Sequence, residues 1–193
     1  MKSQLRILRF LMENKEESFS IRSIAKKLVL NYRIAFDEIK KLENEKLISV
    51  KKLGNTNQCS FNYSFNEKIL MVEHQKRAEL LKNKNLKVLY NTIMGVKNPF
   101  FICLVFGSYA TGTHTNRSDI DLCIITDNQE VKKKVEQALK TLPLGMHILD
   151  FTTKDFISML KTTELNVGKE IVKNNVILKS VENFYELINY ARR

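Results

Sequence analysis

The amino-acid sequence predicts a mixed α/β (α+β) protein with a helical N-terminal module and a small mixed β-sheet flanked by helices in its C-terminal half. Three observations support this fold class. Three stretches in the first 46 residues repeat apolar side chains at helical spacing. Two alternating, strand-like segments follow them, with a Gly-Asn turn between. Further along, strand-like and helix-like segments alternate, which is typical of a sheet covered by helices.

The N-terminal elements follow from apolar periodicity. We expect helices over residues 3–14, 21–28 and 32–46, because apolar residues recur every three or four positions in each. The segments LISVKKL and CSFNYSF flank the turn Gly54–Asn57 and predict a β-hairpin. Three helices followed by a hairpin is the order of a winged helix-turn-helix, and the run SIRSIAKKLVLNYRIAFDEIKKLENEKLISV resembles that family.

The C-terminal elements begin with a helical stretch over residues 67–97, which breaks near Asn83–Asn85 and ends before Pro99. The predicted domains are a winged helix-turn-helix over residues 1–66, a helical connector over 67–85 and a second domain over 86–193. The remaining expected elements are strands at 100–106, 119–125 and 146–151, a helix at about 129–140, and a helical tail at 153–191 with a short strand at 176–178.

Composition narrows the class of protein. A net charge of +11 favours an anionic partner, such as nucleic acid, nucleotides or an acidic protein surface, and is also compatible with a solvated basic surface. The three cysteines fit neither a disulfide framework nor a zinc site, which favours a reducing, cytoplasmic location. No segment has the roughly 20 apolar residues of a membrane span, and the charged N-terminus does not resemble a signal peptide. We therefore expect no membrane association.

The segment LVFGSYATGTHTNRSDIDLCII (residues 104–125) is the most informative for function. An apolar strand runs into Gly107-Ser108, and a second strand opens on Asp119-Ile120-Asp121. Because strand side chains alternate between faces, Asp119 and Asp121 point the same way. Two carboxylates this close repel each other unless a cation lies between them, and an oxygen-only pair suits Mg²⁺. The Gly-Ser turn adds backbone N–H groups for phosphate binding, although Ser108 could equally cap the short helix after it.

This pattern resembles the nucleotidyltransferases of the DNA polymerase beta superfamily, and in particular their minimal branch. The resemblance implies that ATP binds with two Mg²⁺ ions, that Gly107, Ser108 and Ser118 contact the nucleotide, and that three carboxylates hold the metals. The family often reads Gly-Ser-x-Ala-Arg-Gly, and Thr111 stands here in place of the Arg. A positive group near the triphosphate is therefore either missing or supplied from elsewhere.

The third carboxylate implied by the resemblance is Asp150, in the strand-like run MHILDF. Asp155 lies nearby, but Leu149 and Phe151 flank Asp150 in strand alternation and favour it. In the implied mechanism Asp119 and Asp121 hold a metal on the nucleotide phosphates. The same pair and Asp150 hold a second metal that activates the acceptor hydroxyl, and Asp150 could also act as general base.

The N-terminal module offers cationic residues for a nucleic-acid surface. Arg33 and Lys40 lie on the candidate recognition helix, and Lys51 and Lys52 lie in the candidate wing. Four acidic residues on the same helix weaken its positive field. Winged helices also serve as protein-binding modules, so DNA and protein partners both remain open.

The sequence leaves three functions open. The first is an enzyme that transfers a nucleoside monophosphate, AMP from ATP, to a macromolecular hydroxyl. For the minimal branch this acceptor would be a tyrosine of a partner toxin, with the enzyme as antitoxin. The second is a DNA-binding transcriptional regulator whose nucleotidyltransferase domain senses nucleotides or docks a partner. The third is nucleotide addition to RNA ends, which is less consistent with the small size of the chain.

Overall fold

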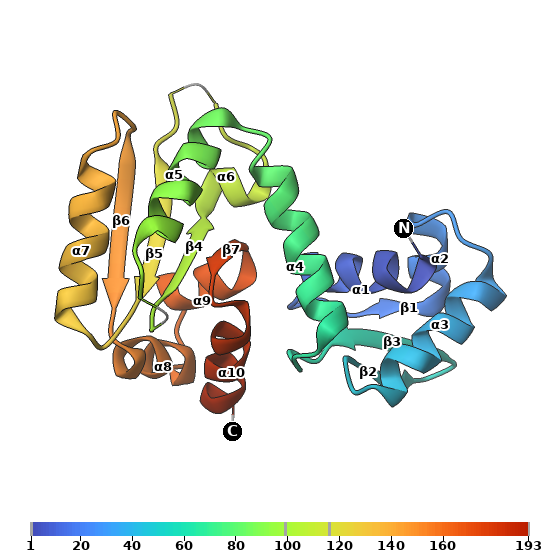
Figure 1. Ribbon diagram of the computed structural model, residues 1–193. Helices are drawn as coiled ribbons and strands as arrows, with labels where there is room; N and C mark the ends of the chain where they lie inside the picture. Colours follow the sequence, from blue (N-terminus) through green and yellow to red (C-terminus); the bar gives the residue numbers. More distant parts are fainter. Residues whose placement is uncertain (1, 99, 116, 193) are drawn as a thin grey trace. The chain divides into compact units, whose positions relative to one another are not determined.

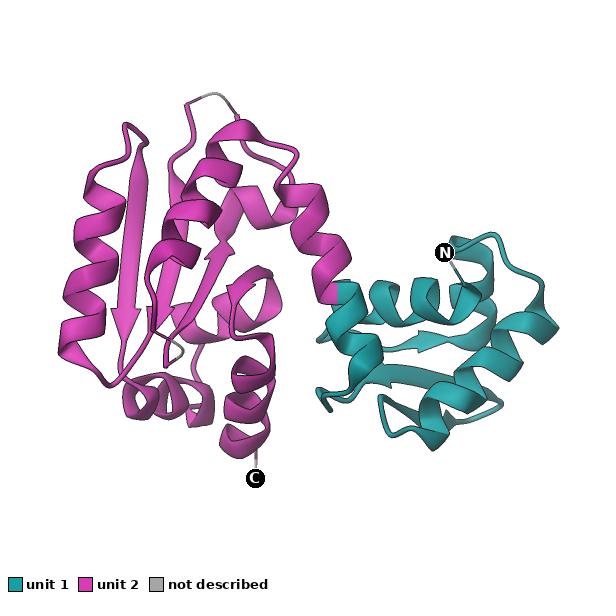
Figure 2. Ribbon diagram, viewed as in Figure 1, with its two compact units in different colours: residues 1–72 teal, residues 73–193 magenta. Residues whose placement is uncertain are grey.

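A computed structural model of the protein describes residues 2–98, 100–115 and 117–192. The chain forms two compact units, residues 1–72 and 73–193 (Figure 2). The expected fold class is confirmed, because the protein is α+β with helices and two small sheets, one in each unit. The helix α4 (Glu67–Leu80) runs across the limit between the units. The domain limits expected at residues 66 and 85 stay a prediction.

In its described residues unit 1 contains the helices α1, α2 and α3, the first residues of α4, and a three-stranded antiparallel sheet in the order β1-β3-β2. A two-residue turn joins β2 to β3, and Gly54 adopts a φ of +57° there, which a residue without Cβ reaches at no steric cost. The short strand β1 was not predicted from the sequence. The elements are α1 (Ser3–Glu13), β1 (Phe19–Ser20), α2 (Ile21–Lys27), α3 (Tyr32–Asn44), β2 (Ile48–Leu53) and β3 (Thr56–Phe61).

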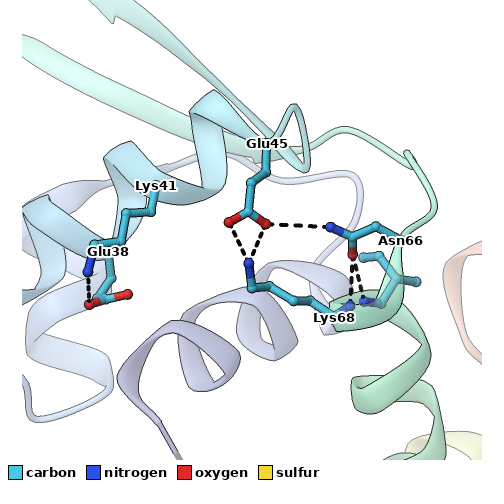
Figure 3. Close-up of polar contacts among 6 residues, drawn as sticks. Glu38, Lys41, Glu45, Asn66 and Lys68 are labelled. Carbon is cyan, nitrogen blue, oxygen red and sulfur yellow. Dashed lines mark hydrogen bonds and ion pairs between the residues drawn. The ribbon is translucent and has the colours of Figure 1, made fainter.

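Polar contacts fix the first turn of α4 to the end of α3 within unit 1 (Figure 3). The Asn66 side chain accepts hydrogen bonds from the backbone N–H groups of Lys68 and Ile69, at 2.9 and 3.2 Å, and so caps the helix. The Lys68 ammonium forms an ion pair with the carboxylate of Glu45, the residue that follows α3. These contacts link two sequence-distant helix ends.

Unit 2 contains a four-stranded mixed sheet in the order β6-β5-β4-β7 (Figure 1). β5 and β6 are parallel, whereas β4 is antiparallel to both β5 and β7. Pro99, expected to end the preceding helix, lies outside the described residues. The elements after α4 are α5 (Lys84–Gly95), β4 (Ile102–Phe106), α6 (Gly107–Thr111), β5 (Ile120–Ile125), α7 (Gln129–Lys140), β6 (Met146–Phe151), α8 (Thr153–Lys161), α9 (Val167–Lys173), β7 (Asn175–Lys179) and α10 (Val181–Ala191).

The two faces of this sheet can be told apart by their contacts. One face belongs to a buried apolar core that it shares with α5 and α7, to which Ile120, Leu122 and Ile124 of β5 contribute. The opposite face carries Phe151 of β6, whose ring contacts Phe156 of α8, with ring centroids 6.0 Å apart. Strand residues of odd number in β5 and β6 therefore face α8, and those of even number face α5 and α7.

None of the helices in the described part of the chain is both long enough and apolar enough to cross a lipid bilayer.

Candidate active site

Three chain segments meet at one edge of the unit 2 sheet. β4 ends there at Phe106, which pairs in register with Asp121 near the start of β5. Asp121 in turn pairs with His147 near the start of β6. The backbone N–H of Ile120 donates to the carbonyl of Gly145 at 2.9 Å, which extends the β5–β6 pairing by one step. The Gly-Ser turn and the Asp-x-Asp motif, ten residues apart in sequence, are thus adjacent in space.

The Asp121 carboxylate lies directly against Gly107. Gly107 adopts a φ of +63°, and a Cβ atom placed on it would overlap Oδ2 of Asp121. Both the backbone conformation and the contact therefore require glycine. A Cβ on Gly145 would overlap Oδ1 of Asp119 in the same way. The two carboxylates of the motif each rest on a glycine backbone, one at the end of β4 and one before β6.

The Asp pair is open to solvent to different degrees. Asp119 is exposed, whereas the side chain of Asp121 keeps 28% of its surface accessible. Ser108 follows Gly107 in the first turn of α6 and is half-buried, and its hydroxyl makes no hydrogen bond within the described part of the chain. The arrangement leaves one exposed carboxylate, one partly covered carboxylate and one uncommitted hydroxyl beside the same turn.

Ser118, expected to contact the nucleotide, instead uses its hydroxyl within the loop that joins α6 to β5. Its Oγ accepts the backbone N–H of Thr115 at 2.9 Å, and the Ser118 carbonyl accepts the Tyr109 hydroxyl at 3.4 Å. The Tyr109 ring stacks on His114, with ring centroids 4.1 Å apart. In this structure Ser118 shapes the loop, and its contact with a nucleotide stays a prediction.

Thr111, which stands where the family resemblance implied an arginine, is the last residue of α6. Its hydroxyl donates to the carbonyls of Gly107 and Ser108 at 3.3 and 3.2 Å and lies 2.8 Å from the Thr113 hydroxyl. These contacts hold the Thr111 side chain against the first turn of α6. They add no positive charge to the site.

The structure does not bring Asp150 together with Asp119 and Asp121. Asp150 pairs in register with Ile124, three positions beyond the Asp121–His147 pair, and its even number places it on the sheet face that α7 covers. Its carboxylate forms an ion pair with Lys132 of α7 at 2.5 Å, and this hydrogen bond raises the pKa of Lys132. Asp150 does lie in a strand, as expected, but no local pattern in the sequence fixes the register of that strand against β5.

His147 is the residue that sequence reasoning missed. It lies on the same sheet face as Asp121, and its Nδ1 is 3.4 Å from Oδ1 of Asp121. In this strand the resemblance implied a carboxylate, Asp150, and not a histidine. The signal that could have found it is the parallel pairing of β5 and β6, which puts the first residues of β6 beside the motif.

The carboxylate oxygens at this edge suit one hard cation whose remaining ligands come from substrate phosphates. Mg²⁺ is commonly bound by one or two carboxylates together with substrate phosphates. Asp119 and Asp121 supply two carboxylates. A group of three or more His, Cys, Asp or Glu side chains able to hold a metal ion does not occur among the described residues. The third carboxylate expected from the sequence is therefore not at this edge.

The cationic residues of unit 1 that are expected to contact nucleic acid differ in whether an acidic side chain already pairs with them. Arg33, Lys51 and Lys52 are exposed, and none of them has an ion-pair partner in the described part of the chain. Lys40 forms an ion pair with Glu43 at 2.7 Å. Neighbouring Lys41 is paired in the same way with Glu38, as Figure 3 shows. Pairing reduces the positive field that these helix lysines offer to phosphate groups.

A large cavity of unit 2 lies away from this edge. It has a volume of about 1330 Å³ and is lined by the start of β4, by the end of β5 and the residues that follow it, and by residues of α8 and α10. Its lining includes Ile125, Thr126 and Tyr190 and none of the residues of the Asp-x-Asp edge. The Asp-x-Asp motif beside the Gly-Ser turn, and not the size of a cavity, identifies the candidate site.

Comparison with known proteins supports this identification. A family model described as "Polymerase beta, Nucleotidyltransferase" matches residues 87–183, which include the Gly-Ser turn, the Asp-x-Asp motif and β6. A search of curated protein sequences gives no match. A solved structure described as "Crystal structure of the toxin-antitoxin with AMP-PNP" is similar at 18% identity, over 53% of this chain and 83% of that chain, with a TM-score of 0.38.

Proposed function

The chain belongs to the polymerase beta nucleotidyltransferase family through residues 87–183, and on this premise we propose that it transfers a nucleoside monophosphate, AMP from ATP, to a macromolecular hydroxyl. The observation that supports the proposal most is the contact between Gly107 and the Asp121 carboxylate, with Asp119 two residues before it on the same side. This contact joins a candidate phosphate-binding turn to a candidate metal-binding pair.

Each part of the edge has a role in the proposed reaction. The backbone N–H groups at Gly107 and Ser108 and the Ser108 hydroxyl bind the phosphates. Asp119 and Asp121 would hold a Mg²⁺ ion that arrives with the nucleotide, and the ion would stabilise negative charge on the phosphates. An acceptor oxygen bonds to the α-phosphorus, the bond between the α- and β-phosphates breaks, pyrophosphate leaves, and the hydroxyl proton passes to water.

The proposed acceptor is a tyrosine hydroxyl of a partner toxin, which would make this protein an antitoxin. The support for this choice is the resemblance of the Gly-Ser and Asp-x-Asp motifs to the minimal nucleotidyltransferases. Both carboxylates of the motif keep solvent-accessible surface, which suits an acceptor as large as a protein.

Transfer can be tested with ATP labelled at the α-phosphate and the product of the neighbouring gene. We expect label on that product and a mass increase of one or more AMP groups, both absent with Asp119→Ala. Asp150→Asn is the matched control, because it removes a carboxylate on the other sheet face, and it should transfer as the wild type does. Label on RNA ends instead would exclude the protein acceptor but keep the transferase. Metal-dependent nucleotide binding with no transfer to any acceptor would favour a second function.

That second function is a DNA-binding regulator that responds to nucleotide. Two observations favour it: the helix–strand order of unit 1, which is the order of a winged helix-turn-helix, and the exposed cations Arg33, Lys51 and Lys52. A gel shift on DNA upstream of the gene tests it. Affinity should fall steeply with salt, and Arg33→Ala with Lys51→Ala should weaken binding and flatten the slope, because fewer counterions are released. Lys40→Ala, which removes a paired lysine, should have a smaller effect. If low salt gives no retardation with folded protein, unit 1 would be a protein-binding module.

A further inference from the structure

The position on β6 beside Asp121 is occupied by an imidazole. In the parallel β5–β6 pair, His147 is the residue directly opposite Asp121, and both side chains point to the same face of the sheet. The His147 Nδ1 lies 3.4 Å from the Asp121 carboxylate, and 62% of its side chain is exposed. A side chain from β6 can therefore share a ligand-binding position with the Asp pair, and in this chain that side chain is histidine.

The three aspartates that follow Asp121 in the sequence lie away from this edge. Asp150 is on the opposite face of the sheet, in an ion pair with Lys132. Asp155 lies in the first turn of α8, after the far end of β6, where its carboxylate accepts the Thr152 hydroxyl at 2.6 Å. Asp127, just beyond the far end of β5, is engaged with the backbone N–H and the hydroxyl of Thr153. None of these three carboxylates can join Asp119 and Asp121 without a change in strand register.

We infer that this edge holds the single divalent cation that arrives with the nucleotide and does not build a second protein-bound metal site for the acceptor hydroxyl. This inference rests on the proposed function for the nucleotide. Mg²⁺ requires near-octahedral oxygen coordination, and a pair of carboxylates cannot complete two such shells. An imidazole nitrogen in the third position suits metals other than Mg²⁺. The resemblance of the sequence implied two metal ions. Because the register of β6 places Asp150 on the other face of the sheet, the third carboxylate that a second ion requires is not at this edge.

The inference predicts that one substitution creates the missing site. His147→Asp places a third carboxylate beside Asp121 on an exposed side chain, so folding should be preserved. His147→Asn is the matched control, because it has similar size and no charge. Asp150→Asn is a second control on the opposite face. His147→Glu repeats the test with a longer carboxylate in case the Asp side chain is too short.

The measurement is electron paramagnetic resonance with Mn²⁺ and a non-hydrolysable ATP analogue, on the full chain. We expect wild type, His147→Asn and Asp150→Asn each to bind one Mn²⁺ with the nucleotide. His147→Asp or His147→Glu should bind one more. The two ions should give the spin-coupled signal of a close pair, because paired metals in such sites lie about 3.5–4 Å apart.

A coupled Mn²⁺ pair in the wild type would overturn the inference, and so would equal Mn²⁺ binding by the wild type and both carboxylate variants. Loss of an ion in Asp150→Asn would overturn it as well. Binding of the analogue is measured separately with a fluorescent nucleotide, so that failure of the proposed function is recognised by itself. If no analogue binds, Mn²⁺ titration alone still decides, because three carboxylates should bind the ion more tightly than two.

Discussion

At the scale of single residues, the candidate site depends on a glycine that serves two purposes. Gly107 lets the chain turn from β4 into α6 with a φ of +63°, and it leaves room for the Asp121 carboxylate. Gly112, at the other end of α6, has a similar φ of +73° but no atom within contact distance of a Cβ. A comparison of alanine substitutions at the two glycines therefore separates the free-energy cost of the left-handed backbone from that of the contact with Asp121.

Gly107→Ala should destabilise the protein more than Gly112→Ala. A left-handed conformation costs an alanine about 1–2 kcal/mol, and this cost applies to both variants. Overpacking at Gly107 should add about 1–3 kcal/mol and displace the Asp121 carboxylate, so nucleotide binding should be lost only in this variant. Denaturant unfolding and ATP titration measure the two effects. Equal loss of stability with unchanged ATP binding in both variants would contradict the contact between Gly107 and Asp121.

The three cysteine thiols should be unreactive in the folded protein. Burial raises the pKa of Cys59 to about 11 and that of Cys103 to about 12, and it raises the pKa of Cys123 as well. At pH 8 only about one Cys59 thiol in a thousand would be the reactive thiolate. Because the folded-state pKa values are raised, the thiols should also favour folding below their unfolded pKa near 9 and lose this contribution as the pH rises toward 11. Alkylation at pH 8 before and after unfolding measures the reactivity of the thiols, and rapid labelling of the native protein would contradict their burial.

At the scale of elements, most helices and strands follow from sequence periodicity, and the site follows only in part. The Gly-Ser turn and the Asp-x-Asp motif could be placed together because only the short helix α6 and one loop separate β4 from β5, and each strand has its own sequence signal. Asp150 and His147 could not be placed, because α7 separates β5 from β6 and no local pattern fixes their register. A shift of one residue in register moves a side chain to the other face of a sheet. The observed register places His147 on the same face as Asp121, and Asp150 on the opposite face. The two-residue strand β1 is too short to leave a periodic signal.

Within unit 2, a buried polar contact links α4 to α10. The Tyr185 hydroxyl donates to the carboxylate of Glu73 at 2.7 Å, and Lys76 also contacts this carboxylate at 2.9 Å. Tyr185 and Glu73 are both fully buried. A buried carboxylate is costly unless it is paired and hydrogen-bonded, so this contact should contribute strongly to stability.

Tyr185→Phe should lower the free energy of unfolding by about 1.5–3 kcal/mol, because it removes a hydrogen bond to a charged group that water cannot replace. Tyr190→Phe is the matched control on the same helix, since Tyr190 keeps 61% of its surface exposed. Its stability should stay within about 0.5 kcal/mol of the wild type. Urea denaturation compares the three proteins, and an equal effect of the two substitutions would contradict the buried contact.

At the scale of the whole molecule, the chain combines two compact units, each with its own sheet. The net charge of +11 suits anionic ligands, and each unit offers a different candidate: nucleotide phosphates at the Asp-x-Asp edge of unit 2, and DNA phosphates at the exposed cations of unit 1. Unit 2 belongs to a family whose chemistry involves nucleoside triphosphates. The winged helix-turn-helix assignment of unit 1 and its DNA contacts remain proposals, and so does the division into three domains.

The proposed function requires that the Gly107–Asp119–Asp121 edge binds a nucleoside triphosphate together with a divalent cation. Calorimetric titration with ATP, with and without Mg²⁺, tests it most directly on wild type, Asp121→Asn and the control Asp150→Asn. We predict that wild type and Asp150→Asn bind ATP only with Mg²⁺. Asp121→Asn should bind at least about tenfold more weakly, a loss of about 1.4 kcal/mol. Equal ATP binding with and without Mg²⁺, or loss of binding in Asp150→Asn but not in Asp121→Asn, would contradict the claim.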